Sequence, residues 1–338
     1  MQKAFITGVA GQELTRDERE LIAASRPAGL ILFARNIRSR EQACDLVADF
    51  RAAAGDERVL VLVDQEGGRV QRLKPPLASL LPPAAAYAAH FPDDRDAAVA
   101  AAWSVARLLA DELRAFSINT DCAPVADLPV PGAHDIIGNR AFGRDAETVI
   151  FLARAFADGL MAGGVLPVFK HIPGHGRAMA DSHLELPVVS TARGDLERSD
   201  FAPFRALAAL PAAMTAHVVF RALDPAAPAS TSRTVTSEII RGYCGFDGLL
   251  MSDDVGMRAL SGSFAERTRA VLGAGSDLAL HCSGNFAEMV EVAEASPPLA
   301  GRALDRFERA LAVTERTAEP FDEAAARATL AALVARTA

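Results

Sequence analysis

Eight short apolar runs, spread over most of the chain, constrain its fold more than any other feature. Nearly continuous apolar runs, each followed by a stretch long enough for a helical crossover, are typical of parallel strands that are covered on both faces. Eight such units predict an α/β fold that consists of a single (β/α)8 barrel of the TIM type. The runs are Ala4 to Thr7, Gly29 to Phe33, Val59 to Val63, Ser117 to Asn119, Val165 to Phe169, Ala213 to Thr215, Leu249 to Met251 and Leu278 to Leu280.

A doubly wound open sheet is the alternative architecture. No glycine-rich GxGxxG or GxxxxGKS motif follows any of the runs, which removes the usual reason to prefer it. Between the runs, apolar residues recur three or four positions apart, as in amphipathic helices. Thr15 with Glu18 and Ser263 with Glu266 have the spacing of capping boxes, which predicts a helix start at each pair.

No internal repeat or serine-rich linker marks a domain boundary, so we expect one catalytic domain over residues 1–338. Two alanine-rich helices, at Ala303 to Glu315 and Asp322 to Ala335, are expected to pack against the barrel and to cover residues 301–338. Their role is interpreted as packing and not as chemistry.

Charge and cysteine usage limit the partners. The net charge is -8 and no basic run is present, which argues against nucleic acid as a partner. The four cysteines form no CxxC pair, as expected for reduced thiols in the cytoplasm. The uncharged stretch from Pro75 to Pro92 contains five prolines and is therefore no membrane helix. We expect a cytoplasmic monomer without a membrane or nucleic-acid partner.

Polar residues follow the predicted strands, and in a (β/α)8 barrel the carboxyl ends of the strands carry the active site. Asp253 and Asp254 stand in Met251-Ser252-Asp253-Asp254, at the end of the seventh predicted strand. Successive strand residues point to opposite sides, so only one of the two is expected to face the barrel axis. For a lone aspartate, capping of the following helix is the alternative. The polar residues are Asn36, Asp64, Asp121, Lys170 with His171, His217, Asp253 and His281.

The densest polar segment is K-H-I-P-G-H-G, from Lys170 to Gly176, followed by Asp181-Ser182-His183. Its proline and glycines disfavour a regular helix, so an irregular loop at the mouth of an active site is expected. The carboxylate of Asp181 would fix the orientation of the nearby His183 ring and favour its protonated form. A metal site is the alternative, but no HExxH signature is present and no metal is expected. Its ligands would be His171, His175, Asp181 and His183.

Two further segments offer binding groups. D-Q-E-G-G-R-V-Q-R, from Asp64 to Arg72, supplies a carboxylate and a forked guanidinium suited to hydroxyl or carboxylate groups. The equally open interpretation is a tight glycine turn with a structural salt bridge. Arg140, in Gly138-Asn139-Arg140, is a surface residue by default and a ligand clamp if its loop folds inward.

Together, K-H-I-P-G-H-G-x4-D-S-H, D-Q-E-G-G-R-V-Q-R, G-N-R and S-D-D resemble the family 3 glycoside hydrolases, specifically the bacterial β-N-acetylglucosaminidases (β-hexosaminidases) of peptidoglycan recycling. The resemblance runs from about Gly29 to Asp254. It implies that Asp253 is the nucleophile and that His183, assisted by Asp181, is the general acid/base. The residues that it implies for binding the N-acetylglucosamine hydroxyls and acetamide are Asp64, Arg72, Arg140, Lys170 and His171.

The resemblance thus implies a retaining exo-hydrolase that needs no cofactor and removes terminal β-linked N-acetylglucosamine, in the cell from muropeptides, through a covalent intermediate on Asp253. Phosphorolysis at the same site is an alternative, because a neutral His183 does not repel an anionic acceptor. Three more alternatives remain open: the acetamido group as internal nucleophile, a metal-dependent barrel hydrolase, and a sugar-binding protein without catalysis.

Overall fold

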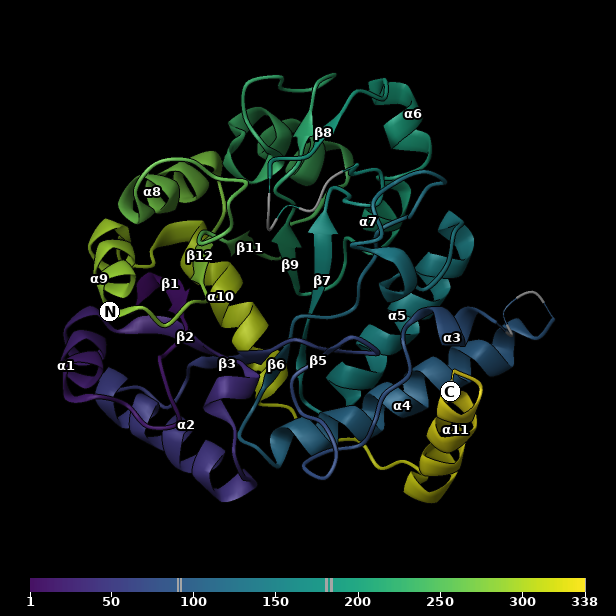
Figure 1. Cartoon of the computed structure of the whole chain (residues 1–338), viewed down its shortest axis with the longest axis horizontal. Coiled ribbons are helices and arrows are strands. Elements are labelled where there is room, and N and C mark those ends of the chain that lie inside the picture. The colour runs from purple at the N-terminus through teal and green to yellow at the C-terminus, as the bar shows by residue number, and fades with distance from the viewer. Residues whose placement is uncertain (90, 92, 180–181, 183–184, 338) are drawn as a thin grey trace.

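A computed structural model describes residues 1–89, 91, 93–179, 182 and 185–337. Eight parallel strands close into a barrel, in the order β1, β2, β3, β6, β7, β9, β11, β12 and back to β1. The predicted (β/α)8 barrel is confirmed, and the open sheet was the wrong alternative (Figure 1). The strands are β1 (Lys3–Thr7), β2 (Pro27–Leu32), β3 (Leu60–Val63), β6 (Thr120–Asp121), β7 (Leu166–Ile172), β9 (Ala212–Thr215), β11 (Leu249–Asp254) and β12 (Leu278–His281).

Seven of the eight predicted runs overlap a barrel strand, and the fourth is wrong. Ser117 to Asn119 precede β6, which begins at Thr120. Ser117 has a left-handed backbone with φ of 60°. The side chain of Asn119 accepts a hydrogen bond from the Val61 N–H at 2.7 Å and donates to the Val59 carbonyl at 2.9 Å. A side chain, not a longer strand, therefore ties this segment to β3.

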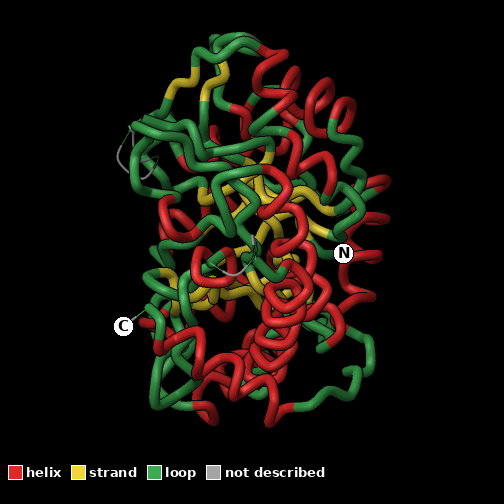
Figure 2. The backbone as a smooth tube through the Cα atoms, turned by 90° about the vertical axis from the view of Figure 1, so that its right-hand side faces the viewer, coloured by secondary structure: helices red, strands yellow, loops and turns green. Residues whose placement is uncertain are grey.

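Helices surround the strands and leave them in the interior of the molecule (Figure 2). Thr15 and Ser263 form the two predicted capping boxes with Glu18 and Glu266. The helices are α1 (Arg16–Ser25), α2 (Arg40–Ala54), α3 (Ala85–Ala88), α4 (Arg95–Arg114), α5 (Ala146–Ala162), α6 (Arg193–Arg198), α7 (Ala202–Ala206), α8 (Phe264–Ala274), α9 (Phe286–Ala295), α10 (Gly301–Thr314) and α11 (Glu323–Ala335), with 3₁₀ helices η1 (Ala34–Asn36), η2 (Gly138–Arg140) and η3 (Ala229–Thr231) and the π-helix η4 (Val235–Tyr243).

The barrel interior is filled by apolar side chains, and α10 covers its amino-terminal end. Phe307 and Leu311 of α10 belong to the same buried cluster as Leu166, Leu249 and Leu278, which lie at the starts of their strands. Full burial of such a side chain contributes about 2–3 kcal/mol. Helix α11 packs against α4 on the outside. Helix α10 thus closes the amino-terminal end of the barrel in the part of the chain that the structure describes.

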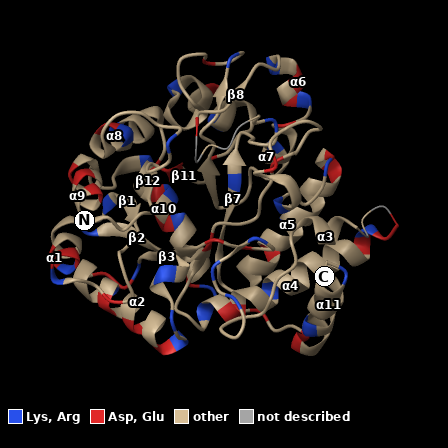
Figure 3. Cartoon of the chain, viewed as in Figure 1, with Lys and Arg blue, Asp and Glu red and all other residues tan. Residues whose placement is uncertain are grey.

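Short additional strands lie at the carboxyl ends of the barrel strands. β4 (Gln65–Gly67) and β5 (Val70–Gln71) form an antiparallel hairpin after β3, and β8 (Val188–Val189) pairs with β10 (Val219–Phe220). On the face seen in Figure 3, acidic and basic residues are mixed along the outer helices. In the part of the chain that the structure describes, no helix is both long and apolar enough to cross a bilayer.

Candidate active site

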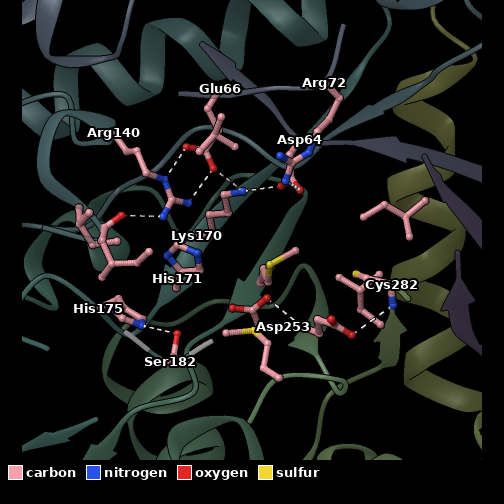
Figure 4. A pocket seen from close by; sticks show the side chains of 18 of the residues that line it. Asp64, Glu66, Arg72, Arg140, Lys170, His171, His175, Ser182, Asp253 and Cys282 are labelled. Atoms are coloured by element: carbon pink, nitrogen blue, oxygen red, sulfur yellow. Dashed lines mark hydrogen bonds and ion pairs between the residues drawn. The ribbon is translucent and has the colours of Figure 1, made fainter. Parts of the chain in front are cut away.

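A cavity of about 450 Å³ opens at the carboxyl ends of the barrel strands (Figure 4). Its volume is within the range of roughly 300–1,000 Å³ that is common for small-molecule sites. Apolar side chains such as Phe33, Ile136, Ile137 and Met257 form part of its wall. Its polar lining consists of Asp64, Glu66, Arg69, Arg72, Arg140, Lys170, His171, His175, Ser182, Asp253 and Asp254.

Five charged side chains on one side of the cavity pair with one another, and we call them the charged cluster: Asp64, Glu66, Arg72, Arg140 and Lys170. The Lys170 Nζ lies 2.8 Å from Asp64 Oδ1 and 2.6 Å from Glu66 Oε1. Arg140 binds Glu66 through two parallel hydrogen bonds of 2.8 Å each. Arg72 Nη2 lies 3.0 Å from Asp64 Oδ2. The cluster thus joins the hairpin, β7 and η2 (Figure 4).

Four members of the charged cluster are held in their ionised form: Asp64, Glu66, Lys170 and Arg140. Burial alone would raise the pKa of Asp64, but the charges of Lys170 and Arg72 outweigh it and hold that pKa well below its ordinary value. Burial is likewise outweighed at Glu66, where Arg140 and Lys170 lower the pKa to about 2. The same carboxylates raise the pKa of Lys170 and of Arg140 against the effect of burial.

The hairpin after β3 shows both features that its sequence left open. Gly67 and Gly68 have left-handed backbones, with φ of 97° and 56°, and a Cβ on Gly67 would lie 2.2 Å from the Pro82 carbonyl oxygen. It is therefore a tight glycine turn with a salt bridge. The same turn also brings Asp64 and Arg72 to the cavity, so the structural interpretation is confirmed and a binding role for the two side chains stays a prediction.

A second group of four residues, which we call the histidine cluster, consists of Asp127, His171, His175 and Ser182, and all of them except Asp127 line the same cavity. The fully buried Asp127 accepts hydrogen bonds from His171 Nδ1 at 2.6 Å and from the His175 backbone N–H at 2.7 Å. His175 Nε2 lies 3.0 Å from Ser182 Oγ. Burial would raise the pKa of Asp127, but His171 lowers it below its ordinary value, so this carboxyl is ionised.

β-Bulges bring successive residues of two strands into the cavity. On β7, Lys170 and Ile172 pair with two consecutive residues of β9, so β7 has one extra residue there. On β11, Met251 and Asp254 pair with two residues of β12 that are only two positions apart, so β11 also has one extra residue. An extra residue in one strand breaks the alternation of side chains. The prediction that only one of Asp253 and Asp254 faces the axis was therefore wrong, because both line the cavity.

The two neighbouring aspartates differ in the direction of their pKa shifts and in hydrogen bonding. Asp254 Oδ1 accepts the N–H groups of Gly256 at 2.9 Å and Cys282 at 3.2 Å, and burial raises the pKa of Asp254. Burial would also raise the pKa of Asp253, but the His217 and His171 rings, the Asp254 N–H and the Lys170 charge lower it below its ordinary value. Asp253 is thus a carboxylate at neutral pH, as a nucleophile requires.

Residues 4–316 match the family model described as the glycosyl hydrolase family 3 N terminal domain. The chain belongs to glycosyl hydrolase family 3. Among its curated relatives is a protein named "Beta-hexosaminidase" from Alkalilimnicola ehrlichii, which is 43% identical over 82% of this chain and 80% of the relative. Another of that name, from Bordetella avium, is 40% identical over 89% of this chain and 86% of the relative.

A solved structure described as native NagZ from Neisseria gonorrhoeae superposes on the chain with a TM-score of 0.87. It is 34% identical, and the match covers 98% of each chain. The resemblance drawn from the sequence motifs is confirmed at the level of the family, and this family 3 chain is a glycoside hydrolase.

The barrel brings together every predicted sugar-binding residue and the predicted nucleophile of this family 3 chain. Asp64, Arg72, Arg140, Lys170, His171 and Asp253 all line one cavity. Asp181 and His183 lie outside the described residues, but Ser182, which stands between them in the sequence, lines the same cavity. Lys170 and His171 were expected on a loop, and that was wrong, because β7 continues to Ile172.

Four of the polar residues that follow the strands do not line the cavity and have other partners. Asn36 donates to the carbonyls of Val9 and Gly11, and His281 Nε2 lies 3.1 Å from Glu288. His217 contacts Ser230 Oγ and the Asp254 carbonyl. Asp121 accepts the Gln65 N–H, and burial raises its pKa to about 8.

Sequence reasoning missed Glu66 and Asp127. Glu66 stands inside the D-Q-E-G-G-R segment, so its neighbours were a signal for it. Asp127 follows β6 and belongs to no predicted motif, so only its contacts with His171 and His175 reveal it. Among the described residues, no three His, Cys, Asp or Glu side chains are arranged to hold a metal ion, although Asp181 and His183 of the considered ligand set are not among them.

Proposed function

We propose that the chain is a retaining exo-β-N-acetylglucosaminidase that hydrolyses terminal β-linked N-acetylglucosamine. Asp253 is the nucleophile, and His183, assisted by Asp181, is the general acid/base. One observation carries the proposal: the ionised Asp253 lines the same cavity as the five proposed sugar-binding residues and as Ser182. The names of the relatives, which include two β-hexosaminidases, support a hexosaminide as the class of substrate.

The charged cluster and His171 are proposed to hold the sugar. An ammonium group has three donors and a carboxylate about four acceptor sites, so the ion pairs of Lys170 and Asp64 leave sites for hydroxyl groups. His171 faces Asp127 with Nδ1, so its Nε2 is the atom that can reach a sugar. Because the side chains of the charged cluster already pair with one another, binding of a neutral sugar requires little reorganisation of the cluster.

The chemistry follows the double displacement of retaining glycosidases. In the first step Asp253 attacks the anomeric carbon while protonated His183 gives its proton to the leaving oxygen. In the second step the neutral His183 takes a proton from water, whose oxygen forms the new bond to the anomeric carbon as the bond to Asp253 breaks. The sugar leaves with its original anomeric configuration.

The test is turnover of an aryl N-acetylglucosaminide by Asp253→Ala, which should lose about a thousandfold or more. Asp254→Asn is the matched control, because its amide oxygen can still accept the Gly256 and Cys282 N–H groups. A 2-fluoro sugar should add its mass to Asp253. Full turnover by Asp253→Ala would contradict the proposal, and absence of the label would point to the acetamido group as internal nucleophile.

Phosphorolysis is tested by the products. In the presence of phosphate we expect free N-acetylglucosamine and no sugar 1-phosphate, at a rate that phosphate does not change. We also propose that the natural substrates are N-acetylglucosaminyl anhydromuropeptides of cell-wall recycling in the cytoplasm, and that the chain acts as a monomer. Release of N-acetylglucosamine from a defined muropeptide, compared with chitobiose, tests the first of these proposals. Sedimentation tests the second.

A further inference from the structure

His175 makes a hydrogen bond that the proposed chemistry does not use. Its Nε2 lies 3.0 Å from Ser182 Oγ, and the two residues are only 3% and 2% exposed (Figure 4). Ser182 is the described member of the Asp181-Ser182-His183 segment. This bond is therefore a direct link between the turn after β7 and the segment that supplies the proposed acid/base.

The other side of His175 is fixed to the barrel. Its backbone N–H donates to Asp127 Oδ1 at 2.7 Å. The next residue, Gly176, passes so close to the chain after β6 that a Cβ there would lie 1.9 Å from the Leu128 carbonyl oxygen. The Val130 N–H also donates to the Gly176 carbonyl at 3.3 Å. Gly176 thus allows a close backbone approach that holds the neighbouring His175 in place.

The ring is neutral at neutral pH, because burial and the neighbouring His171 lower the pKa of His175 to about 4. A neutral imidazole forms a directional hydrogen bond with a hydroxyl and adds no charge to the cavity. Its Nδ1 is buried and has no hydrogen-bond partner among the described residues. The Ser182 hydroxyl is therefore the described side-chain partner of this ring.

We infer that His175 is a positioning residue, which acts through Ser182 to place the proposed general acid/base relative to the bound sugar. The inference rests on the proposed function in one respect, the assignment of His183 as the acid/base. It adds that the His175–Ser182 bond governs how well the leaving oxygen is protonated. Loss of the bond should slow only those substrates that need a proton on the leaving group.

The experiment compares two N-acetylglucosaminides, one with a 2,4-dinitrophenyl leaving group that departs without protonation and one with an alkyl leaving group that needs it. The value of kcat/KM reports the steps up to departure of the leaving group. General acid catalysis contributes about 10²–10⁴-fold, so a misplaced acid should cost the alkyl substrate roughly tenfold or more. For His175→Ala and Ser182→Ala we expect this loss on the alkyl substrate and a change below about twofold on the other.

The double variant tests whether the two residues act as one unit. His175→Ala combined with Ser182→Ala should be no slower on the alkyl substrate than the slower single variant, because both changes remove the same bond. Ser182→Ala removes only a hydroxyl, so it keeps the test valid if His175→Ala fails to fold. Multiplied losses in the double variant would show independent roles and overturn the inference.

The matched control is Ser230→Ala. Ser230 Oγ lies 2.6 Å from His217 Nδ1, in another buried histidine–serine pair, and His217 contacts the Asp254 carbonyl on the nucleophile side of the cavity. We expect any loss in this variant to be the same for both substrates. Equal losses on both substrates in Ser182→Ala would overturn the positioning role and leave Asp253 unaffected. Turnover that survives Asp253→Ala would instead overturn the proposed nucleophile.

Discussion

The charged cluster and three members of the histidine cluster (His171, His175 and Ser182) line the same cavity, but the two clusters are held by different forces. In the charged cluster, two carboxylates pair with three cations through ion pairs of 2.6 to 3.0 Å. In the histidine cluster, one carboxylate, Asp127, receives directional hydrogen bonds, and the His175 ring that follows is neutral. One side of the site is stabilised mainly by ion pairs and the other mainly by directional hydrogen bonds.

This difference between the two clusters predicts that substitutions in them affect stability and catalysis to different degrees. Removing one partner of a buried ion pair leaves an uncompensated charge, which is costly to the folded state. Removing a neutral hydrogen bond costs the folded state less but frees a side chain to turn. Substitutions in the charged cluster should therefore lower the free energy of unfolding as well as sugar binding, whereas those in the histidine cluster should act mainly on kcat/KM.

The largest loss of stability is expected from Lys170→Met. It leaves the carboxylates of Asp64 and Glu66 without their shared ammonium, so the free energy of unfolding should fall by about 3–5 kcal/mol. Denaturant unfolding at pH 7 measures this. Lys74→Met, at an exposed position just beyond the hairpin, is the control and should change the value by no more than about 0.5 kcal/mol. Similar losses of stability in Lys170→Met and Lys74→Met would contradict the expected role of ion pairs in the charged cluster.

The second effect is a dependence of stability on pH. Because the pKa of Glu66 is lowered from 4.5 to about 2, its ion pairs contribute fully above pH 4.5. That contribution, about 3 kcal/mol, is lost as the pH falls toward 2. Glu66→Gln should be less stable than the wild-type chain at pH 7, and the gap should narrow below pH 4.5. Thermal unfolding from pH 7 to pH 2 measures this difference in stability between the two proteins. A difference that stays constant over this range would contradict the lowered pKa of Glu66.

Asp127→Asn should have a smaller effect on stability and a larger one on rate. The amide keeps one acceptor oxygen but turns its NH₂ group toward a donor of His171 or His175, which should cost about 1–3 kcal/mol. We expect kcat/KM to fall by more than the loss of folded protein explains. A fall in stability of about 4 kcal/mol, as large as that expected in the charged cluster, together with a constant kcat/KM would contradict the comparison.

The smallest effect is expected from Arg69→Ala. Arg69 reaches from the hairpin to the loop after β6, where it binds Asp135 Oδ2 at 3.1 Å and the carbonyl of Ile136 at 2.8 Å. Its side chain is 42% exposed, so the loss of stability should stay below about 1 kcal/mol. A rise in KM with an unchanged kcat would show that this loop shapes the wall formed by Ile136 and Ile137.

Local signals explain which parts of the fold could be predicted. Capping boxes and apolar runs depend on residues close together in the chain, so the helix starts at Arg16 and Phe264 and seven strands were predicted correctly. The fourth strand was misplaced because the left-handed backbone of Ser117 and the side-chain bonds of Asn119 to β3 are not visible in an apolar pattern. A motif located Asp253, but not that Asp254 would line the same cavity.

The sequence by itself determined the barrel and the kinds of chemical group at its carboxyl end, because apolar periodicity and residue order are local properties of a chain. Only the tertiary structure decided which of those groups share one cavity. The bulges in β7 and β11, the pairing of Glu66 with Arg140, and the reach of Asp127 to His171 all depend on strand register and on contacts between distant segments. These are set when the barrel closes, and no short stretch of sequence encodes them alone.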